Sequence, residues 1–267
     1  MITSYDVVIR TFNSARTLKR ALESLHTQTV PPANIIVIDS GSTDETVTIA
    51  KSHGADVWPY GNLPFNFSRA LNLGVERVKA PACLVISSHV IILESDVTAS
   101  LLDLISKAEV PAAYVNWNKT SGTVTFVDTD TFDGNNGLWN TCAMYRTDVL
   151  RNFSFDEDVP SAEDQHLASR LFIAGFKTGV LGGPLLSYEN PYSNSRKWRN
   201  VYVSVAYFSY RKNMSWRNVG FLLLSVLRFL CRLRPRAAYN HFVVAIRIVF
   251  ARYKKPQFPS RYFKVSN

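Results

Sequence analysis

The stretch VVIRTFNSARTLKRALESLHTQTVPPANIIVIDSGSTDETVTIAK, residues 7–51, decides the fold. Two apolar runs typical of buried strands alternate with two stretches that carry apolar residues at helical spacing, over residues 5–10, 15–28, 35–38 and 43–53. The connections between them are short and polar. Strand, helix, strand and helix in this order predict an α/β fold, a mostly parallel Rossmann-like sheet with helices on both faces.

The same alternation continues along the next 130 residues. Helices are predicted over residues 67–78, 100–107 and 162–174, and strands over residues 83–87, 123–127, 143–146 and 178–181. No repeat or low-complexity segment interrupts the pattern. We therefore expect one α/β domain over residues 1–190.

Polar side chains follow three of the predicted strands, at residues 10–13, 39–44 and 87–89. The carboxyl ends of parallel strands meet at one edge of a sheet, where ligands of such folds bind. There Asp39 is suited to accept hydrogen bonds from a base imide or a ribose hydroxyl, and Gly41 lets the backbone approach closely. The alternative is that Asp39 and Asp44 only form the turn and cap the next helix.

Composition excludes several other classes of protein. With 267 residues and 46% hydrophobic residues the chain can bury a sizeable core, which argues against disorder. Its three cysteines lie far apart and suit neither a disulfide framework nor a metal site, so a reducing compartment is expected. The first residues, MITSYDVVIRTF, lack the pattern of a secretory signal.

Charge divides the chain sharply near residue 190. Residues 1–189 carry 14 Lys/Arg and all 21 Asp/Glu, whereas residues 190–267 carry 16 Lys/Arg and no acid. Within this basic region, aromatic or apolar stretches edged with arginine cover residues 198–210, 220–231 and 239–253. We expect a second, helical region over residues 191–267.

Helices of this composition suit the interface of an anionic membrane, and each apolar stretch is shorter than the roughly 20 residues that span a bilayer. The alternative is that they pack on the first domain or on a second subunit in a homo-oligomer. No nucleic-acid-binding module is recognisable, so nucleic acid is not an expected partner.

Three stretches together resemble family 2 glycosyltransferases: residues 7–51, FNFSRALNLGVERVKAPACLVISSHVIIL at 65–93, and AEDQHLASRLFIAGFKTGVL at 162–181. The second is similar in particular to a bacterial rhamnosyltransferase-like branch, in which Ser-x-His replaces the usual Asp-x-Asp. The resemblance covers about residues 5–190 and implies a GT-A fold.

The resemblance implies an inverting transferase. It would move a sugar from a UDP- or dTDP-sugar to a glycan or lipid-linked glycan during synthesis of a bacterial surface polysaccharide. Such an enzyme would work in the cytoplasm, peripherally on the inner face of the cytoplasmic membrane.

The resemblance also assigns roles around the donor. Thr11, Asn13 and Arg16 would flank the nucleotide. Asp39 would contact its base, with Ser42 and Asp44 supporting that loop. Arg69 and Asn72 would face the nucleotide or the donor sugar, although Arg69 also fits a plain helix surface. Ser88 and His89 would lie by the diphosphate.

The Asp-x-Asp motif normally holds a divalent cation, Mn²⁺ or Mg²⁺, and Ser87-Ser88-His89 stands in its place. His89 occupies the position of the second aspartate. It would be a metal ligand, a hydrogen-bond donor to the diphosphate as imidazolium, or only a strand-end histidine. Glu189 sits where relatives often have a histidine and would be a second ligand. Both a metal-dependent and a metal-independent enzyme remain open.

The pair Glu163-Asp164 resembles the catalytic Glu-Asp of the family. Asp164 would accept the proton of the acceptor hydroxyl as general base. Adjacent carboxylates also raise a pKa by mutual repulsion. The alternative is that both acids only stabilise the start of a helix. Trp139, in the polar stretch 128–139, would stack on an acceptor sugar or pack in the core.

Two other functions remain open at this level. Loss of Asp-x-Asp fits a non-catalytic module that binds a nucleotide or glycan. The basic region fits a membrane-associated scaffold.

Overall fold

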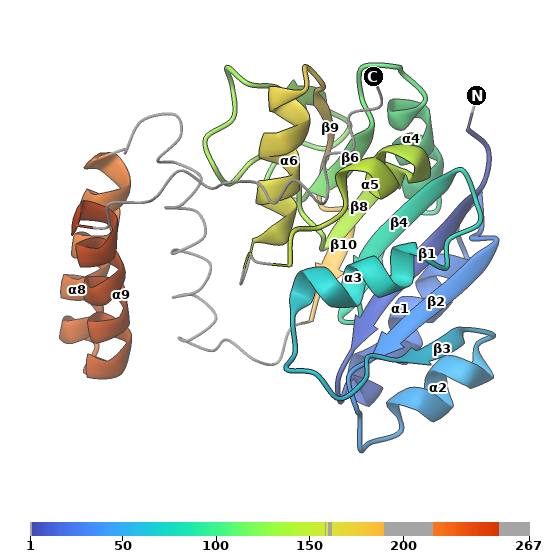
Figure 1. Cartoon of the computed structure of the whole chain (residues 1–267), viewed down its shortest axis with the longest axis horizontal. Coiled ribbons are helices and arrows are strands. Elements are labelled where there is room, and N and C mark those ends of the chain that lie inside the picture. Colours follow the sequence, from blue (N-terminus) through green and yellow to red (C-terminus); the bar gives the residue numbers. More distant parts are fainter. Residues whose placement is uncertain (1, 158, 160–161, 190–215, 251–267) are drawn as a thin grey trace.

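An eight-stranded mixed sheet forms the middle layer of the protein in this computed structural model (Figure 1). The structure describes residues 2–157, 159, 162–189 and 216–250. The strand order is β3-β2-β1-β4-β8-β6-β9-β7, and β10 pairs with β5 in a separate ribbon. The strands are β1 (Tyr5–Thr11), β2 (Asn34–Asp39), β3 (Asp56–Pro59), β4 (Ala82–Ser87), β5 (Val90–Ile92), β6 (Ala112–Asn116), β7 (Val124–Val127), β8 (Cys142–Arg146), β9 (Thr178–Gly182) and β10 (Leu186–Tyr188).

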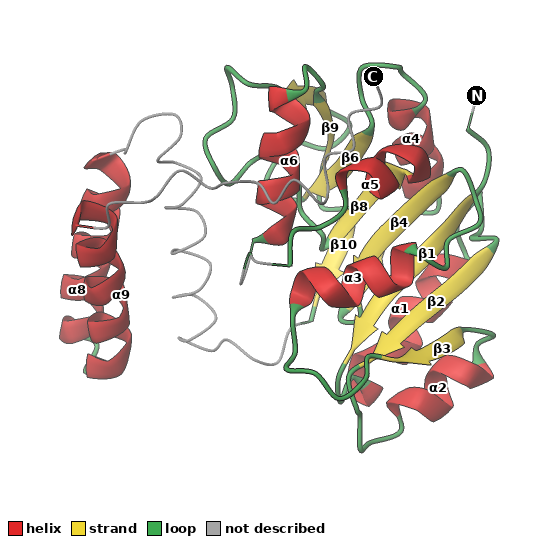
Figure 2. Ribbon diagram, in the orientation of Figure 1, coloured by secondary structure: helices red, strands yellow, loops and turns green. Residues whose placement is uncertain are grey.

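Helices cover both faces of this sheet (Figure 2). They are α1 (Ala15–His26), α2 (Thr46–Ser52), α3 (Phe67–Val75), α4 (Val97–Ile105), α5 (Thr147–Phe153) and α6 (Glu163–Ile173). One buried cluster joins the sheet to α1, α2 and α4, and the other joins it to α3, α5 and α6. Side chains alternate along a strand, so Val7 and Ile9 of β1 enter the first cluster while Val8 enters the second. The expected α/β fold with helices on both faces is confirmed.

The sheet changes direction in the middle. The strands β3, β2, β1 and β4 are parallel, whereas β8 pairs antiparallel with both β4 and β6. Consequently β1, β2, β4 and β6 end at the same edge at which β8 begins. We call this edge the ligand edge, and it carries Thr11 opposite Asp39 and Arg10 opposite Ser87.

Helix α3 packs tightly against β1 at Gly74. A Cβ atom placed on Gly74 would collide with the side chain of Val8 on β1. The absence of a side chain at residue 74 therefore lets α3 approach the strand that carries Arg10.

Several elements differ from their prediction. The helix expected over 67–78 ends at Val75, and the one expected over 43–53 begins at Thr46. The short strands β3, β5, β6 and β10 and helix α5 were not predicted. Strand β3 is an edge strand with Asp and Pro in its sequence DVWP, and β5 and β10 have three residues each, which is too short for a periodic signal.

Helices α8 (Trp216–Cys231) and α9 (Pro235–Phe250) pack against each other as a helical hairpin in the basic region. The helix expected over residues 198–210 lies outside the described residues. Among the residues that are described, no helix is both long and apolar enough to cross a membrane.

Candidate active site

The loop after β2 is organised by Asp39, whose carboxylate accepts four hydrogen bonds. Oδ1 accepts from the hydroxyls of Thr11 (2.8 Å) and Ser42 (2.5 Å), and Oδ2 accepts from the backbone N–H groups of Gly41 (3.1 Å) and Ser42 (2.8 Å). A carboxylate offers about four acceptor positions. Asp39 therefore shapes this turn, and a contact to a nucleobase would exchange one of these hydrogen bonds.

Asn13 and Asp44 join this loop to the one that follows β1. Asn13 has a left-handed backbone (φ 47°), its N–H donates to the Ser42 hydroxyl at 2.9 Å, and its side-chain oxygen accepts from the Thr43 N–H at 2.9 Å. Asp44 accepts from the N–H of Ala15 at 3.1 Å, in the first turn of α1. The loop after β2 thus supplies a hydrogen-bond acceptor to the start of α1.

Ser88 and His89 form the corner between β4 and β5. The hydroxyls of Ser88 and Ser14 lie 2.9 Å apart, and the Ser88 carbonyl accepts from the Thr17 hydroxyl at 2.9 Å. The His89 ring meets the Tyr188 ring edge to face at a centroid distance of 4.8 Å. This corner therefore lies against the start of α1 on one side and the end of β10 on the other.

The side chains suggested as metal ligands do not make a ready cation site. Glu189 is adjacent to the corner, since its N–H donates to the His89 carbonyl at 2.9 Å, but its carboxylate is ion-paired with Arg20. Arg16 donates to the Glu189 carbonyl at 3.2 Å. Nowhere in the described residues do three His, Cys, Asp or Glu side chains gather as metal ligands would. Two guanidinium groups lie here instead of a carboxylate cluster.

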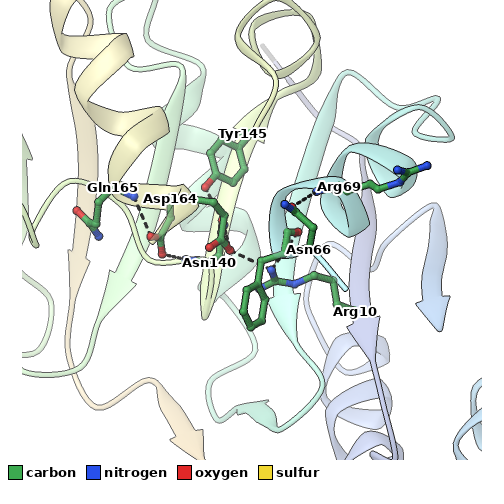
Figure 3. Close-up of polar contacts among 9 residues, drawn as sticks. Arg10, Asn66, Arg69, Asn140, Tyr145, Asp164 and Gln165 are labelled. Atoms are coloured by element: carbon green, nitrogen blue, oxygen red, sulfur yellow. Dashed lines mark hydrogen bonds and ion pairs between the residues drawn. The ribbon is translucent and has the colours of Figure 1, made fainter. Parts of the chain in front are cut away.

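Glu163 and Asp164 open α6 at the ligand edge, and Asp164 is hydrogen-bonded to two backbone groups (Figure 3). Its Oδ2 accepts from the N–H of Asn140 at 3.0 Å and its Oδ1 from the N–H of Gln165 at 2.8 Å. Glu163 is buried, and its Oε1 accepts from the Arg10 guanidinium at 3.0 Å and the Asn140 amide at 3.3 Å. Asn140 thus donates to both neighbouring carboxylates, through its backbone N–H to Asp164 and its side-chain amide to Glu163.

The pKa of Asp164 is raised to about 7, first by burial and then by the negative charge of Glu163. Hydrogen bonds from Asn140 and Gln165 and the charge of Arg10 oppose this rise. Because the two carboxyls interact, the titration belongs to the pair. A carboxylate that is half ionised near neutral pH is suited to general base catalysis.

Three residues at this site were given no role from the sequence: Asn140, Tyr145 and Arg10, which was noted only as part of the polar strand end 10–13. Tyr145 donates its hydroxyl to the Asn140 side-chain oxygen at 2.6 Å. Burial, followed by the charges of Asp164 and Glu163, holds the pKa of Tyr145 well above its usual value, so it remains a donor. Arg10 alone carried a signal in the sequence, as a charge within an apolar strand.

Arg69 and Asn72 lie on α3, apart from the carboxylates. The Arg69 side chain points away from Asp164 in Figure 3, and its N–H donates to Asn66 at the start of the helix (2.9 Å). The Asn72 amide donates to the Phe155 carbonyl and accepts from the Phe155 N–H, both at 2.9 Å. In this arrangement Asn72 fastens α3 to the segment that precedes α6.

Comparison with known proteins identifies a matching family and related sequences. The profile of glycosyl transferase family 2 matches residues 6–153. The O-antigen chain rhamnosyltransferase RfbN of Salmonella typhimurium is 24% identical over 218 residues, which cover 73% of this chain and 69% of that protein. The O-antigen chain rhamnosyltransferase WbaN of Salmonella anatum is 22% identical over 221 residues, covering 74% and 70%.

Solved structures share the fold at low identity. S. aureus TarS, residues 1–349, superposes with a TM-score of 0.59 at 16% identity, covering 94% of this chain and 93% of that one. The mannosyltransferase PcManGT from Pyrobaculum calidifontis, solved with GDP-Man and Mn²⁺, gives a TM-score of 0.61 at 12% identity, covering 93% and 88%.

Proposed function

We propose that this chain, which belongs to glycosyl transferase family 2, is an inverting transferase that uses Asp164 as general base. It is a glycosyltransferase distantly related to O-antigen rhamnosyltransferases. The donor would be a UDP- or dTDP-sugar, and the acceptor a glycan or lipid-linked glycan of a bacterial surface polysaccharide. The observation that carries the proposal is the geometry of the Asp164 carboxyl, which lies beside Glu163 at the ligand edge and is fixed by two backbone hydrogen bonds.

The proposed step is a single displacement. The acceptor oxygen attacks the anomeric carbon while Asp164 accepts its proton, and the bond to the diphosphate breaks on the opposite face. Glu163 stays ion-paired with Arg10 and makes the local potential more negative. Burial, and after it that potential, make Asp164 a stronger base than an isolated aspartate.

Donor binding is proposed along the loops after β1, β2 and β4. Thr11, Asn13 and Asp39 would surround the nucleoside, held in shape by Ser42 and Asp44. Arg16 and His89 would face the diphosphate, with Ser88 at the same corner. Asn72 would act at a distance, by holding α3 against the segment that precedes α6, whereas the Arg69 side chain fits a plain helix surface.

Turnover measured with a panel of nucleotide-sugars and glycan acceptors tests the assignment of the base. Asp164→Asn is expected to lower release of nucleoside diphosphate by about 100-fold to 10,000-fold, the range for loss of a general base. Asp103→Asn, on an exposed position of α4, is the matched control and should leave the rate unchanged.

Two results would contradict the proposal. Full turnover by Asp164→Asn would remove Asp164 as the base. Nucleotide binding by the native chain without turnover on any acceptor would indicate a non-catalytic binding module.

We also propose that transfer does not require a divalent cation, because Arg20 occupies the Glu189 carboxylate and Arg16 lies beside it. Activity should change less than about twofold between EDTA and added Mn²⁺. A large loss in EDTA that Mn²⁺ restores, and that His89→Ala abolishes, would show instead that His89 is a metal ligand.

The helical hairpin is proposed to lie in an anionic membrane surface. Helix α8 exposes Leu223, Leu224, Leu227 and Leu230, which fall on one helical face. Residues 190–267 contain no acidic side chain to oppose binding to negative headgroups. An exposed apolar face beside positive charge is the pattern of interfacial helices.

A further inference from the structure

Four aromatic rings follow one another across the ligand edge, and we call them the aromatic row: Tyr188, Trp117, Trp139 and Tyr114. Ring centroids lie 5.8 Å apart for Tyr188 and Trp117, 4.9 Å for Trp117 and Trp139, and 5.4 Å for Trp139 and Tyr114. The planes of Tyr188 and Trp117 are within 26° of parallel.

The row reaches the groups assigned to the chemistry at two points. Tyr188 contacts His89 at the corner after β4. Toward the other end, the third ring, Trp139, precedes Asn140, whose N–H donates to Asp164 at 3.0 Å. The row therefore runs from the proposed diphosphate corner to the proposed base.

The strand order separates the two tryptophans of this row from the loop that ends in Asp39. Asp39 ends β2, on one side of β4, whereas Trp117 follows β6 and Trp139 precedes β8, on the other side. A molecule on the row would approach Asp164 from the side opposite the nucleotide. This is the side from which an acceptor must come in a displacement.

Exposure of the rings increases along the row. Tyr114 is fully buried, both tryptophans are half-buried, and Tyr188 is 45% exposed. Core packing accounts for Tyr114. Large rings that stay partly open at a ligand edge are typical of binding sites, where aromatic faces supply apolar contact area. The C–H face of a pyranose ring is a matching partner for such a surface.

We propose that the aromatic row, chiefly Trp117 and Tyr188, binds the sugar rings of the acceptor glycan. This inference rests on the proposed transferase function, and it adds the location of the acceptor and the side chains that contact it. Trp139 extends the acceptor surface to Asn140, whose N–H donates to the proposed base Asp164.

Kinetics with a saturating donor and a panel of methyl pyranosides as acceptors test the row. Trp117→Leu and Tyr188→Leu should each raise the acceptor KM by about threefold to tenfold, as expected for loss of one aromatic contact, with kcat unchanged. Tyr188→Phe retains the ring and should retain the native KM. Trp58→Leu, at an exposed tryptophan on β3, is the control and should also leave it unchanged.

Saturation-transfer NMR of the same pyranosides in the presence of UDP provides a readout that does not need turnover. Weaker saturation transfer to the pyranosides from the two leucine variants than from the native protein supports the row, even if no donor is ever turned over. Native-like KM or native-like transfer in both variants would overturn it, even if the transferase function holds. Equal loss in Tyr188→Phe would overturn the role of the ring face.

Discussion

The protonation state of Asp164 should determine the activity of the enzyme directly. Only its ionised form can accept a proton, so kcat/KM should rise with pH through an apparent pKa of about 7 and then level off. A pH–rate profile of the native enzyme measures this. A flat profile between pH 5.5 and 8.5 would contradict the assignment of Asp164 as base.

Stability should show the opposite dependence on pH. The folded pKa of Asp164 lies above its unfolded value, so the folded state binds more protons between about pH 4 and 7. This contribution to stability is fully present below pH 4 and is lost as pH rises through 7. Thermal unfolding of Asp164→Asn should therefore lack this component, and the control Asp103→Asn should retain it.

Asn140 shows why part of the site could not be predicted from sequence. The motif Glu163-Asp164 is local, and its position at a helix start was predicted from residues 162–174. Asn140 belongs to a polar loop with several similar asparagines, and only the fold brings its backbone to Asp164 and its side chain to Glu163. A contact between segments that are distant in the chain has no characteristic spacing by which it could be recognised in the sequence.

At the scale of elements, the close approach of α3 to β1 gives a direct test. Gly74→Ala should lower the free energy of unfolding by about 1–3 kcal/mol, because the new Cβ collides with Val8 in a packed cluster. Urea unfolding measures the change. Gly220→Ala in α8, where no atom lies within 4 Å of the new Cβ, is the control and should stabilise by up to about 1 kcal/mol. A neutral Gly74→Ala would show that α3 can shift freely.

Elements were predictable from the sequence where a pattern of apolar residues marks the buried face, and short or fully buried elements lack such a pattern. Helix α1 and strands β1, β2 and β4 are apolar on the faces they bury, so their pattern survives in one sequence. Strand β6 (AAYVN) shows no alternation because it is buried throughout. Helix α5 begins immediately after β8, without a turn signal to separate them.

At the scale of the whole molecule, the helical hairpin predicts binding to vesicles that contain anionic lipid. The double variant Leu224→Ser/Leu227→Ser removes side chains that are 67% and 61% exposed, and it should weaken binding about tenfold or more. Ile173→Ser, at a 64% exposed position in α6, is the control. Co-sedimentation at low and high salt measures both, and binding should fall as salt rises.

An unchanged affinity of the double variant would contradict membrane binding through α8. Sedimentation velocity without lipid tests whether a second copy of the chain covers this face of α8 instead of a membrane. A native dimer that the double variant dissociates would show that the leucines pack against a second copy of the chain.

The seam between β4 and β8, where the sheet changes direction, has a consequence for how such enzymes diversify. Under the proposed roles, the nucleotide is held by strands on one side of the seam and the acceptor by strands on the other, with the base between them. Substitutions around β6, β8 and β10 can then alter acceptor choice while the first 90 residues continue to serve the same donor. New glycan linkages become accessible by local change on one flank, without rebuilding the half that activates the sugar.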